Sequence, residues 1–459
     1  MAEAVTPRAI VDGGLCIGCG SCAAGRAMTW DGYGLRKPEG QLEQAGRDFA
    51  ATCPFSPLAR DEDAIAAARF PAAPHRDTRI GRYEANYVGH VAEAEYRAGG
   101  SSGGMVTWVA AQLLQSGAID GVAHVVPTDG ADGIHFRFAV SRSVEALRAG
   151  SRSRYFPVDM AEVLAEIRRT PGRYAIVGIP CFIKAVNLLR ENDPLIAERV
   201  THLLGLFCGH MKSTRFVDSF AWQLGVERDQ VRGVEYRRKD AGRPANWYTA
   251  QLTLADGSVH AKDWWHLADG DWGAGYFMAS ACNWCDDVVA ETADISFGDA
   301  WVEPYSSDGR GTNVVVVRSP ELRDLIAAAS TDGRLDVTAV DADFIAGTQA
   351  AGLRQRREGL AYRLTWRKRG IRPRKRVAPL RAGIGWRRRQ VYRSRAAIAR
   401  WSHRLAAAAR ATGQPWLYVG WARAALSLYQ GLIYARGRTG KVMDRIERLV
   451  DRRDAPDVD

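Results

Sequence analysis

Three of the eight cysteines stand close together near the start of the chain, and their spacing is that of a metal-binding loop. Cys16, Cys19 and Cys22 lie in the string CIGCGSC, with two residues between neighbouring thiols. A loop with this spacing can wrap three corners of an iron–sulfur cube. Gly18 and Gly20 allow the tight backbone that brings N–H groups close to sulfur.

The fourth ligand of such a cube must come from elsewhere in the chain. Cys53 is the natural candidate because Pro54 follows it, as proline follows the last ligand of bacterial ferredoxin runs. This pair lies roughly thirty residues beyond the loop, which favours a single 4Fe–4S cluster over a two-cluster module. A zinc knuckle is the alternative, although zinc sites prefer two separated pairs of ligands. The intervening WDGYGLRKPEGQ predicts a hairpin or a turn-rich excursion.

The other four cysteines supply a second possible set of ligands. Cys181 follows the apolar run YAIVGIP, Cys208 follows THLLGLF, and Cys282 and Cys285 form the local pair CNWC. Apolar runs bounded by Gly and Pro predict buried strands of an α/β sheet, whose carboxyl ends face one crevice. We therefore expect a second 4Fe–4S cluster. Inert core thiols and a zinc site are the alternatives.

A Ser/Gly-rich turn precedes a predicted helix in YRAGGSSGGMVTWVAAQLLQSGAIDGV. Trp108, Leu113 and Leu114 give this helix an apolar side, and Gly117 is a suitable stop. Small residues at a helix start leave backbone N–H groups free to bind phosphate. The string is neither GxGxxG nor a Walker motif, so a flexible loop is the alternative.

Four further polar residues lie near these motifs. Asp294 and Asp299, in ADISFGDAW, fit ordinary turn chemistry, while the functional alternative turns Asp299 toward a cofactor. Lys184 and His210 each stand close to a cysteine and could supply protons, although structural roles are more common for such residues.

The order of the motifs resembles a known family. SSGG, GIPC, FCGH, CNWC and ADISFGDAW, with YRRKDAG followed by WY and with GRGTNVVVVRS, resemble the coenzyme F420 hydrogenase/dehydrogenase beta-subunit family. The resemblance extends from Cys16 to about Arg318. Relatives include formate dehydrogenase beta subunits, glutamate synthase-associated proteins, reductases of chlorophyll intermediates and proteins encoded with polysaccharide biosynthesis genes.

The resemblance implies bound FAD and a cluster beside it. The cluster ligands that it implies are Cys181, Cys208, Cys282 and Cys285. The FAD contacts that it implies are Ser101, Ser102, Gly103 and Gly104, with Thr312 and Asn313 as weaker candidates. The Cys16 group corresponds to the amino-terminal ferredoxin module of many relatives, trimmed here to four of the eight cysteines of a two-cluster module.

The remaining sequence sets the cellular context. The amino-terminal segment lacks the pattern of a secretory signal, and no long uncharged apolar stretch predicts a membrane span. We therefore expect a cytoplasmic protein whose cysteines serve metal or redox chemistry rather than disulfides.

The carboxyl-terminal part differs in charge from the rest. From Ala351 onward there are 28 Lys+Arg and 7 Asp+Glu, whereas the first 350 residues hold 35 and 45. Two charge runs, RKRGIRPRKR and WRRRQVYRSR, precede the predicted amphipathic helix WLYVGWARAALSLYQGLIYAR. The helix could pack on the body or lie in a membrane interface, and the charge runs could instead be solvated. No fold signature favours specific nucleic-acid binding.

Together these features predict an α/β protein in three parts. These are an iron–sulfur module (1–80), a mixed-sheet domain for FAD and a cluster (81–350) and a basic, mostly helical extension (351–459). We expect an oxidoreductase passing electrons between FAD and ferredoxin, a hydrogenase- or dehydrogenase-type subunit, or a deazaflavin. The alternatives are a membrane-peripheral flavoenzyme acting on a sugar or lipid-linked intermediate and a non-enzymatic relay subunit.

Overall fold

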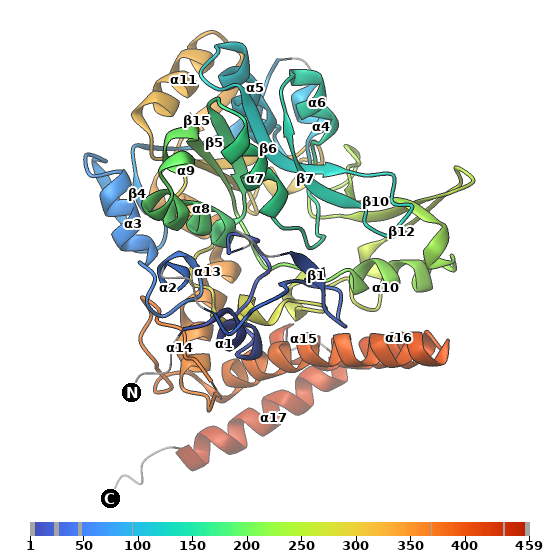
Figure 1. Cartoon of the computed structure of the whole chain (residues 1–459). Helices are drawn as coiled ribbons and strands as arrows, with labels where there is room; N and C mark the ends of the chain where they lie inside the picture. Colours follow the sequence, from blue (N-terminus) through green and yellow to red (C-terminus); the bar gives the residue numbers. More distant parts are fainter. Residues whose placement is uncertain are drawn as a thin grey trace, which may run out of the picture.

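The structure is a computed structural model that describes residues 5–22, 27–44, 48–93, 95–368, 370–434 and 437–454 (Figure 1). Its centre is an eight-stranded sheet in the order β15-β5-β14-β13-β9-β8-β6-β7. The strands are β5 (Ala85–Val91), β6 (Gly121–Pro127), β7 (Phe136–Ser141), β8 (Tyr174–Gly178), β9 (Val200–Leu206), β13 (Ile295–Asp299), β14 (Asn313–Val317) and β15 (Leu335–Ala339). The middle strands β13, β9, β8 and β6 are parallel, and antiparallel strands flank them. The predicted mixed α/β class is confirmed.

Helices cover both faces of this sheet, as the apolar content of its strands requires. On β14, Val315 and Val317 pack in one buried cluster, while Val314 and Val316 pack in another, because successive side chains alternate between faces. The first face is covered by α5 (Met105–Gln115), α6 (Val144–Ala149) and α11 (Pro320–Thr331). The second is covered by α7 (Ala161–Arg169), α8 (Pro180–Asn192), α12 (Ala342–Thr348) and α13 (Ala350–Arg356).

Smaller units surround the sheet. The predicted amino-terminal hairpin is present as β1 (Met28–Trp30) paired with β2 (Arg36–Pro38). A three-stranded sheet forms from β10 (Val231–Arg238), β11 (Thr249–Leu254) and β12 (Val259–Asp263), and α10 (Arg215–Leu224) packs on it. The remaining elements before residue 200 are α1 (Pro7–Asp12), α2 (Phe49–Thr52), α3 (Glu62–Arg69), β3 (His75–Asp77), β4 (Gly81–Tyr83), α4 (Tyr96–Gly99) and α9 (Pro194–Arg199).

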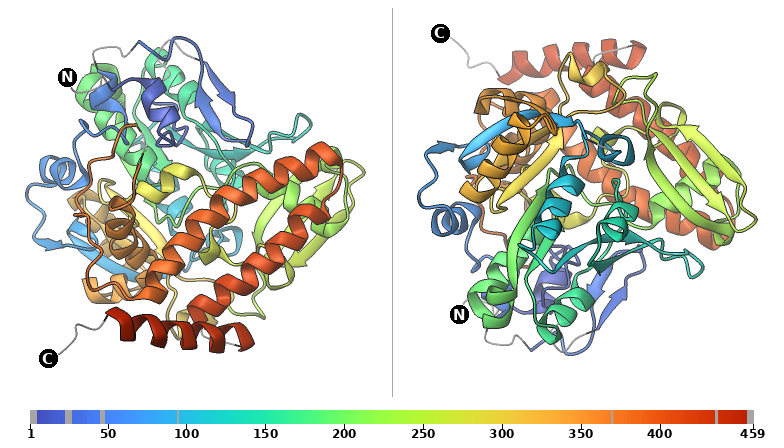
Figure 2. Two further views of the ribbon diagram at one scale, coloured as in Figure 1. Left: turned by 90° about the horizontal axis from the view of Figure 1, so that it is seen from below. Right: turned by 90° about the horizontal axis from the view of Figure 1, so that it is seen from above.

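The basic extension is helical, as predicted, and it packs on the body. Its helices are α14 (Glu358–Leu364), α15 (Trp386–Thr412), α16 (Trp416–Tyr434) and α17 (Gly437–Asp454). α15 and α16 form a hairpin that lies across one side of the molecule, opposite α5 and α11 (Figure 2). The Phe277 N–H donates to Ser402 Oγ at 2.8 Å, and the Tyr276 hydroxyl donates to the Ala422 carbonyl at 2.7 Å. In the described part of the chain, no helix combines the length and apolarity that a membrane crossing requires.

Candidate functional site

The first thiol group comprises Cys16, Cys19, Cys22 and Cys53. The loop that carries the first three follows α1 and packs closely against the backbone of two neighbouring segments. A Cβ atom on Gly18 would come within 2.4 Å of the Arg36 carbonyl oxygen, and one on Gly20 within 2.8 Å of the Ala161 nitrogen. Both glycines also have positive φ, so only glycine fits the loop. Cys53 caps the carboxyl end of α2.

These four thiols lie close enough to influence one another. Burial raises the pKa of the Cys53 thiol well above its ordinary value, and the other three thiols of the group raise it further. Burial also raises the pKa of Cys19 to about 11. Four such thiols are costly to ionise together unless a positive centre binds them, which is the condition that a cysteine-ligated metal core satisfies.

The second thiol group comprises Cys181, Cys208, Cys282 and Cys285. As predicted, Cys181 and Cys208 follow adjacent parallel strands, β8 and β9, with Cys181 in the first turn of α8. Cys282 lies in the 3₁₀ helix η4 (Ser280–Trp284), and Cys285 caps it. The Met211 N–H donates to Cys282 Sγ at 3.3 Å, so the backbone offers this sulfur a hydrogen bond.

A buried arginine from α13 accompanies the second thiol group. Arg356 Nη2 donates to the carbonyls of Cys208 and Gly209 at 3.0 and 2.7 Å, while its Nη1 is buried without a partner in the described part. Burial acts to lower the pKa of Arg356, but the four thiols overcome this and raise it. An orphaned cationic donor beside four thiols suits an anionic core held by cysteine.

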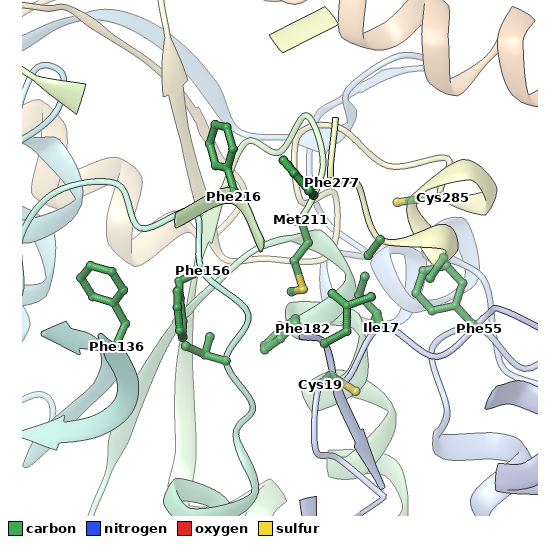
Figure 3. Packing of buried hydrophobic residues seen from close by; sticks show 14 of the residues in the cluster. Ile17, Cys19, Phe55, Phe136, Phe156, Phe182, Met211, Phe216, Phe277 and Cys285 are labelled. Carbon is green, nitrogen blue, oxygen red and sulfur yellow. The ribbon is translucent and has the colours of Figure 1, made fainter. Parts of the chain in front are cut away.

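The two thiol groups are neighbours. Burial raises the pKa of Cys181, and the other thiols of its own group and then Cys19 raise it further. Cys19 and Cys285 belong to one buried cluster with Ile17 and Phe55 (Figure 3). Among the described residues, no three His, Cys, Asp or Glu side chains are grouped as ligands of one metal ion. A 4Fe–4S cube does not need three side chains around one ion, because each of its four thiolates binds a different iron.

A narrow cleft lies at the predicted Ser/Gly turn. Of the six predicted FAD contacts, Ser101, Ser102 and Thr312 line this cleft. Ser102 Oγ donates to the Thr312 carbonyl at 2.9 Å, so the turn and the strand β14 are joined. α5 begins directly after the turn, as predicted, with Trp108 and Leu113 buried and Leu114 partly buried.

The other three predicted contacts position the turn and do not line the cleft. Gly104 has a φ of 83°, and a Cβ there would lie 2.5 Å from the Tyr96 backbone. A Cβ on Gly103 would come within 2.8 Å of Asn313 Oδ1. That oxygen accepts the Met105 N–H at 3.1 Å, so Asn313 occupies one donor at the helix start where phosphate was predicted to bind.

One lysine fixes the loops around the cleft. Lys239 Nζ donates to the carbonyls of Arg97, Ser102 and Arg310 at 2.6, 2.9 and 2.7 Å. Burial lowers the pKa of Lys239 to about 8. This lysine belongs to the string YRRKDAG, so the family resemblance marked the segment although no pattern assigned a role to the side chain.

Asp299 lies at the end of β13 and lines the cleft. It pairs with Arg237 Nη1 at 3.0 Å, and the Arg237 guanidinium lies 4.3 Å from the centroid of Tyr248. Asp299 is therefore part of the cleft wall, and its orientation toward a cofactor stays a prediction. Arg237 was not singled out from the sequence, because its partner is 62 residues away.

A row of rings connects the cleft to the second thiol group. Successive centroids are 6.1 Å apart for Trp301 and Tyr248, 5.4 Å for Tyr248 and Trp264, 6.0 Å for Trp264 and Trp272, and 4.2 Å for Trp272 and His210. His210 stands two residues after Cys208. The row fills the space between the two sites with apolar surface that excludes water.

Lys184 and His210, which could supply protons, and Asp294 are all held in structural contacts. Lys184 forms a buried ion pair with Glu62 at 3.1 Å. Burial lowers the pKa of His210 well below its ordinary value, and Arg395 Nη2 lies 3.3 Å from its Nδ1. Asp294 pairs with Arg69 and accepts the Leu203 N–H at 2.7 Å, so it ties α3 to β9. These contacts favour the structural interpretation of all three residues.

The chain resembles known proteins between residues 86 and 343, which leaves out the first thiol group. Two family models described as "Coenzyme F420 hydrogenase/dehydrogenase, beta subunit" match it, the amino-terminal model at residues 86–165 and the carboxyl-terminal model at residues 172–343. A curated relative, the F chain of the F(420)H(2) dehydrogenase of Methanosarcina mazei, is 23% identical over 220 residues, which are 46% of this chain and 56% of that protein. The match thus spans little more than half the length of the relative.

A solved structure has a similar fold. It is a chain from the xenon-derivatised F420-reducing [NiFe] hydrogenase complex of Methanosarcina barkeri, with a TM-score of 0.50 and 17% identity. The match covers 65% of this chain and 99% of that one. The two family domains together span more than half of the chain, and they include the cleft and the second thiol group. The chain belongs to the coenzyme F420 hydrogenase/dehydrogenase beta-subunit family.

Proposed function

We propose that this chain is a cytoplasmic iron–sulfur flavoprotein that passes electrons between FAD and an external carrier through two 4Fe–4S clusters. The first thiol group would hold one cluster and the second thiol group the other, with FAD in the cleft. When bound, FAD exchanges two electrons with a substrate and single electrons with iron–sulfur centres. In this proposal residues 1–80 form the first cluster module, 81–350 the flavin and second cluster domain, and 351–459 the helical extension.

The proximity of the two thiol groups carries the proposal. Ser280 Oγ, two residues before Cys282, donates at 2.8 Å to the carbonyl of Gly14, which stands two residues before Cys16. Cys19 of the first group also adds to the raised pKa of Cys181 in the second. The row of rings from Trp301 to His210 then extends from the second group to the cleft. Three sites in such an order suit electron transfer, because each centre needs a close neighbour and little access to water.

The chain's own side chains would orient the cofactors and balance their charge. Lys239 holds the Ser102 and Arg310 carbonyls, so it fixes two walls of the cleft. The Arg237–Asp299 pair sets the polarity of a third wall. Arg356 supplies a buried positive charge beside four thiolates, which favours the reduced form of a bound centre.

The candidate external carriers are ferredoxin, a hydrogenase- or dehydrogenase-type subunit and a deazaflavin. The two similar proteins are named as a subunit of an F(420)H(2) dehydrogenase and as part of an F420-reducing hydrogenase complex, which supports a partner subunit.

Anaerobic purification with iron, sulfide, zinc and flavin measured together tests the proposal. We expect about eight iron and one flavin per chain for two cubes and FAD. Cys285→Ser should remove the second cluster and keep the first, and Cys53→Ser should do the reverse, so each variant is the control for the other. Stoichiometric zinc, or about four iron in the unaltered protein, would contradict the assignment.

Flavin content separates this proposal from its alternatives. Two intact clusters without flavin would make the chain an electron-relay subunit. The flavoenzyme acting on a sugar or lipid-linked intermediate is favoured by the outer side of the α15–α16 hairpin, where Trp401, Trp416 and Leu428 are exposed. Oxidation of the reduced flavin by a lipid-linked sugar, but not by ferredoxin, would support that alternative.

A further inference from the structure

A second hollow lies in the basic extension, and its lining shares no residue with the cleft or with either thiol group. It has a volume of about 480 Å³ and opens to solvent between α14, the segment after it and α15. Four arginines line it, and no acidic residue does. They are Arg367, Arg381, Arg393 and Arg400.

These four arginines differ from their neighbours in having no acidic partner. None of them forms an ion pair with a described carboxylate, whereas Arg388 pairs with Glu358 at 3.0 Å. Asp444 and Glu447 both pair with Arg387. The acidic side chains that the structure places in α14 and α17 thus pair with other arginines. They are Glu358, Asp444 and Glu447. Four guanidinium groups around one hollow repel each other unless an anion lies between them.

The walls of the hollow add an aromatic surface and a spare donor. The Arg393 guanidinium lies 5.9 Å from the centroid of Tyr362, and Tyr362 packs edge-to-face on Trp366 at 5.7 Å. The indole N–H of Trp366 is buried and has no acceptor in the described part of the chain. A buried donor without a partner is unfavourable, and a bound acceptor would remove that cost.

We propose that this hollow binds a phosphate-bearing ligand. Arginine presents paired N–H donors that match the oxygens of phosphate, and several arginines favour a polyanion over a single carboxylate. Tyr362 and Trp366 would contact the apolar part of the ligand, and the Trp366 N–H would donate to an oxygen. This site is separate from the proposed flavin and cluster sites, so the proposal does not depend on them.

The same chemistry has two sources, an anionic lipid headgroup and a free phosphorylated compound. Trp401 directly follows Arg400 and is exposed, as are Trp416 and Leu428 on the adjoining helix. Exposed tryptophan and leucine beside arginine suit a bilayer surface. A free compound would need only the hollow itself.

Binding to two probes tests the site in the intact holoprotein. Inorganic pyrophosphate is titrated calorimetrically at low salt, and cosedimentation is measured with vesicles of phosphatidylcholine alone or with phosphatidylglycerol. We expect binding to at least one probe, weakened at least tenfold by the double variant Arg393→Gln/Arg400→Gln, since each loses a charged hydrogen bond. Pyrophosphate binding alone identifies a soluble ligand, and binding confined to anionic vesicles identifies a lipid.

Arg404→Gln is the matched control, because Arg404 is exposed one turn along α15 and does not line the hollow. Trp366→Phe should weaken binding severalfold by removing only the N–H. An unchanged Tm shows that each variant is folded. No binding to either probe, or an equal loss in Arg404→Gln, overturns the proposal.

Discussion

Replacing Arg356 by glutamine should make the reduction potential of the centre held by the second thiol group more negative. Arg356 is buried, its guanidinium pKa is raised by all four thiols of that group, and it donates to the Cys208 and Gly209 carbonyls. A positive charge so placed stabilises the more negative, reduced form of the centre. Its removal disfavours reduction.

Coulomb's law gives the size of the shift. For a charge on the order of 8 Å away and an effective dielectric constant of about 20, the interaction is about 2 kcal/mol. At 59 mV per 1.4 kcal/mol for one electron, this is about 90 mV. The assay is a potentiometric titration followed by electron paramagnetic resonance, in which the signal of the centre held by the first thiol group serves as an internal reference.

Two further variants separate charge from folding. Arg356→Lys keeps the charge and should recover most of the potential, whereas Arg354→Gln changes an exposed arginine of the same helix and should leave the potential unaltered. An intact cluster whose potential is unchanged in Arg356→Gln would refute the electrostatic reasoning.

Three other variants test the fold and the cleft. Lys239→Met should lower flavin retention about tenfold or more by freeing three carbonyls, with Lys441→Met, which changes an exposed lysine of α17 outside the cleft, as the control. In the unaltered protein, retention should fall as pH rises through about 8, where Lys239 loses a proton and one donor. Burial lowers the pKa of His124 to about 4, so the unfolded state binds more protons between that value and about 6.5. Stability measured by urea unfolding should therefore fall as pH drops through this range, less steeply in His124→Gln. Arg376→Gln should cost about 3–5 kcal/mol, seen as a lower Tm, because Arg376 pairs with the buried Glu291 at 2.7 Å, while the exposed Arg372→Gln should not.

Sequence patterns predicted those parts of the site that are encoded locally. The apolar runs before Cys181 and Cys208 are adjacent parallel strands, because continuous apolar runs are typical of strands buried on both faces. The hairpin after Cys22 and the helix after Gly104 also depend on neighbouring residues alone. Glycine spacing and apolar periodicity were sufficient for these elements.

Contacts between distant segments were outside the reach of these patterns. Arg356 lies 148 residues from Cys208, and Arg237 lies 62 residues from Asp299. Nothing in the residues around an arginine shows whether it will be solvated or buried against a thiol. The sequence therefore identified the cysteines but not the cation beside them.

The partners of the basic side chains in the extension also lie far away in the sequence, so local patterns did not predict them. The charge runs after residue 351 fit a solvated surface, yet several basic side chains of the extension are buried against the body. Lys375 pairs with the buried Asp286 at 3.2 Å, Arg363 Nε donates to the Asn283 carbonyl at 2.7 Å, and Arg395 Nη2 lies 3.3 Å from His210 Nδ1. Asn283 and Asp286 flank Cys285, so the extension brings cations to the segment that carries the second thiol group. Since burying such charges is costly without partners, an anionic centre at this place would stabilise the docking of the extension as well as the thiols. Loss of the second cluster should therefore expose the α15–α16 hairpin to proteolysis, and an equally protected hairpin in cluster-free protein would contradict this coupling.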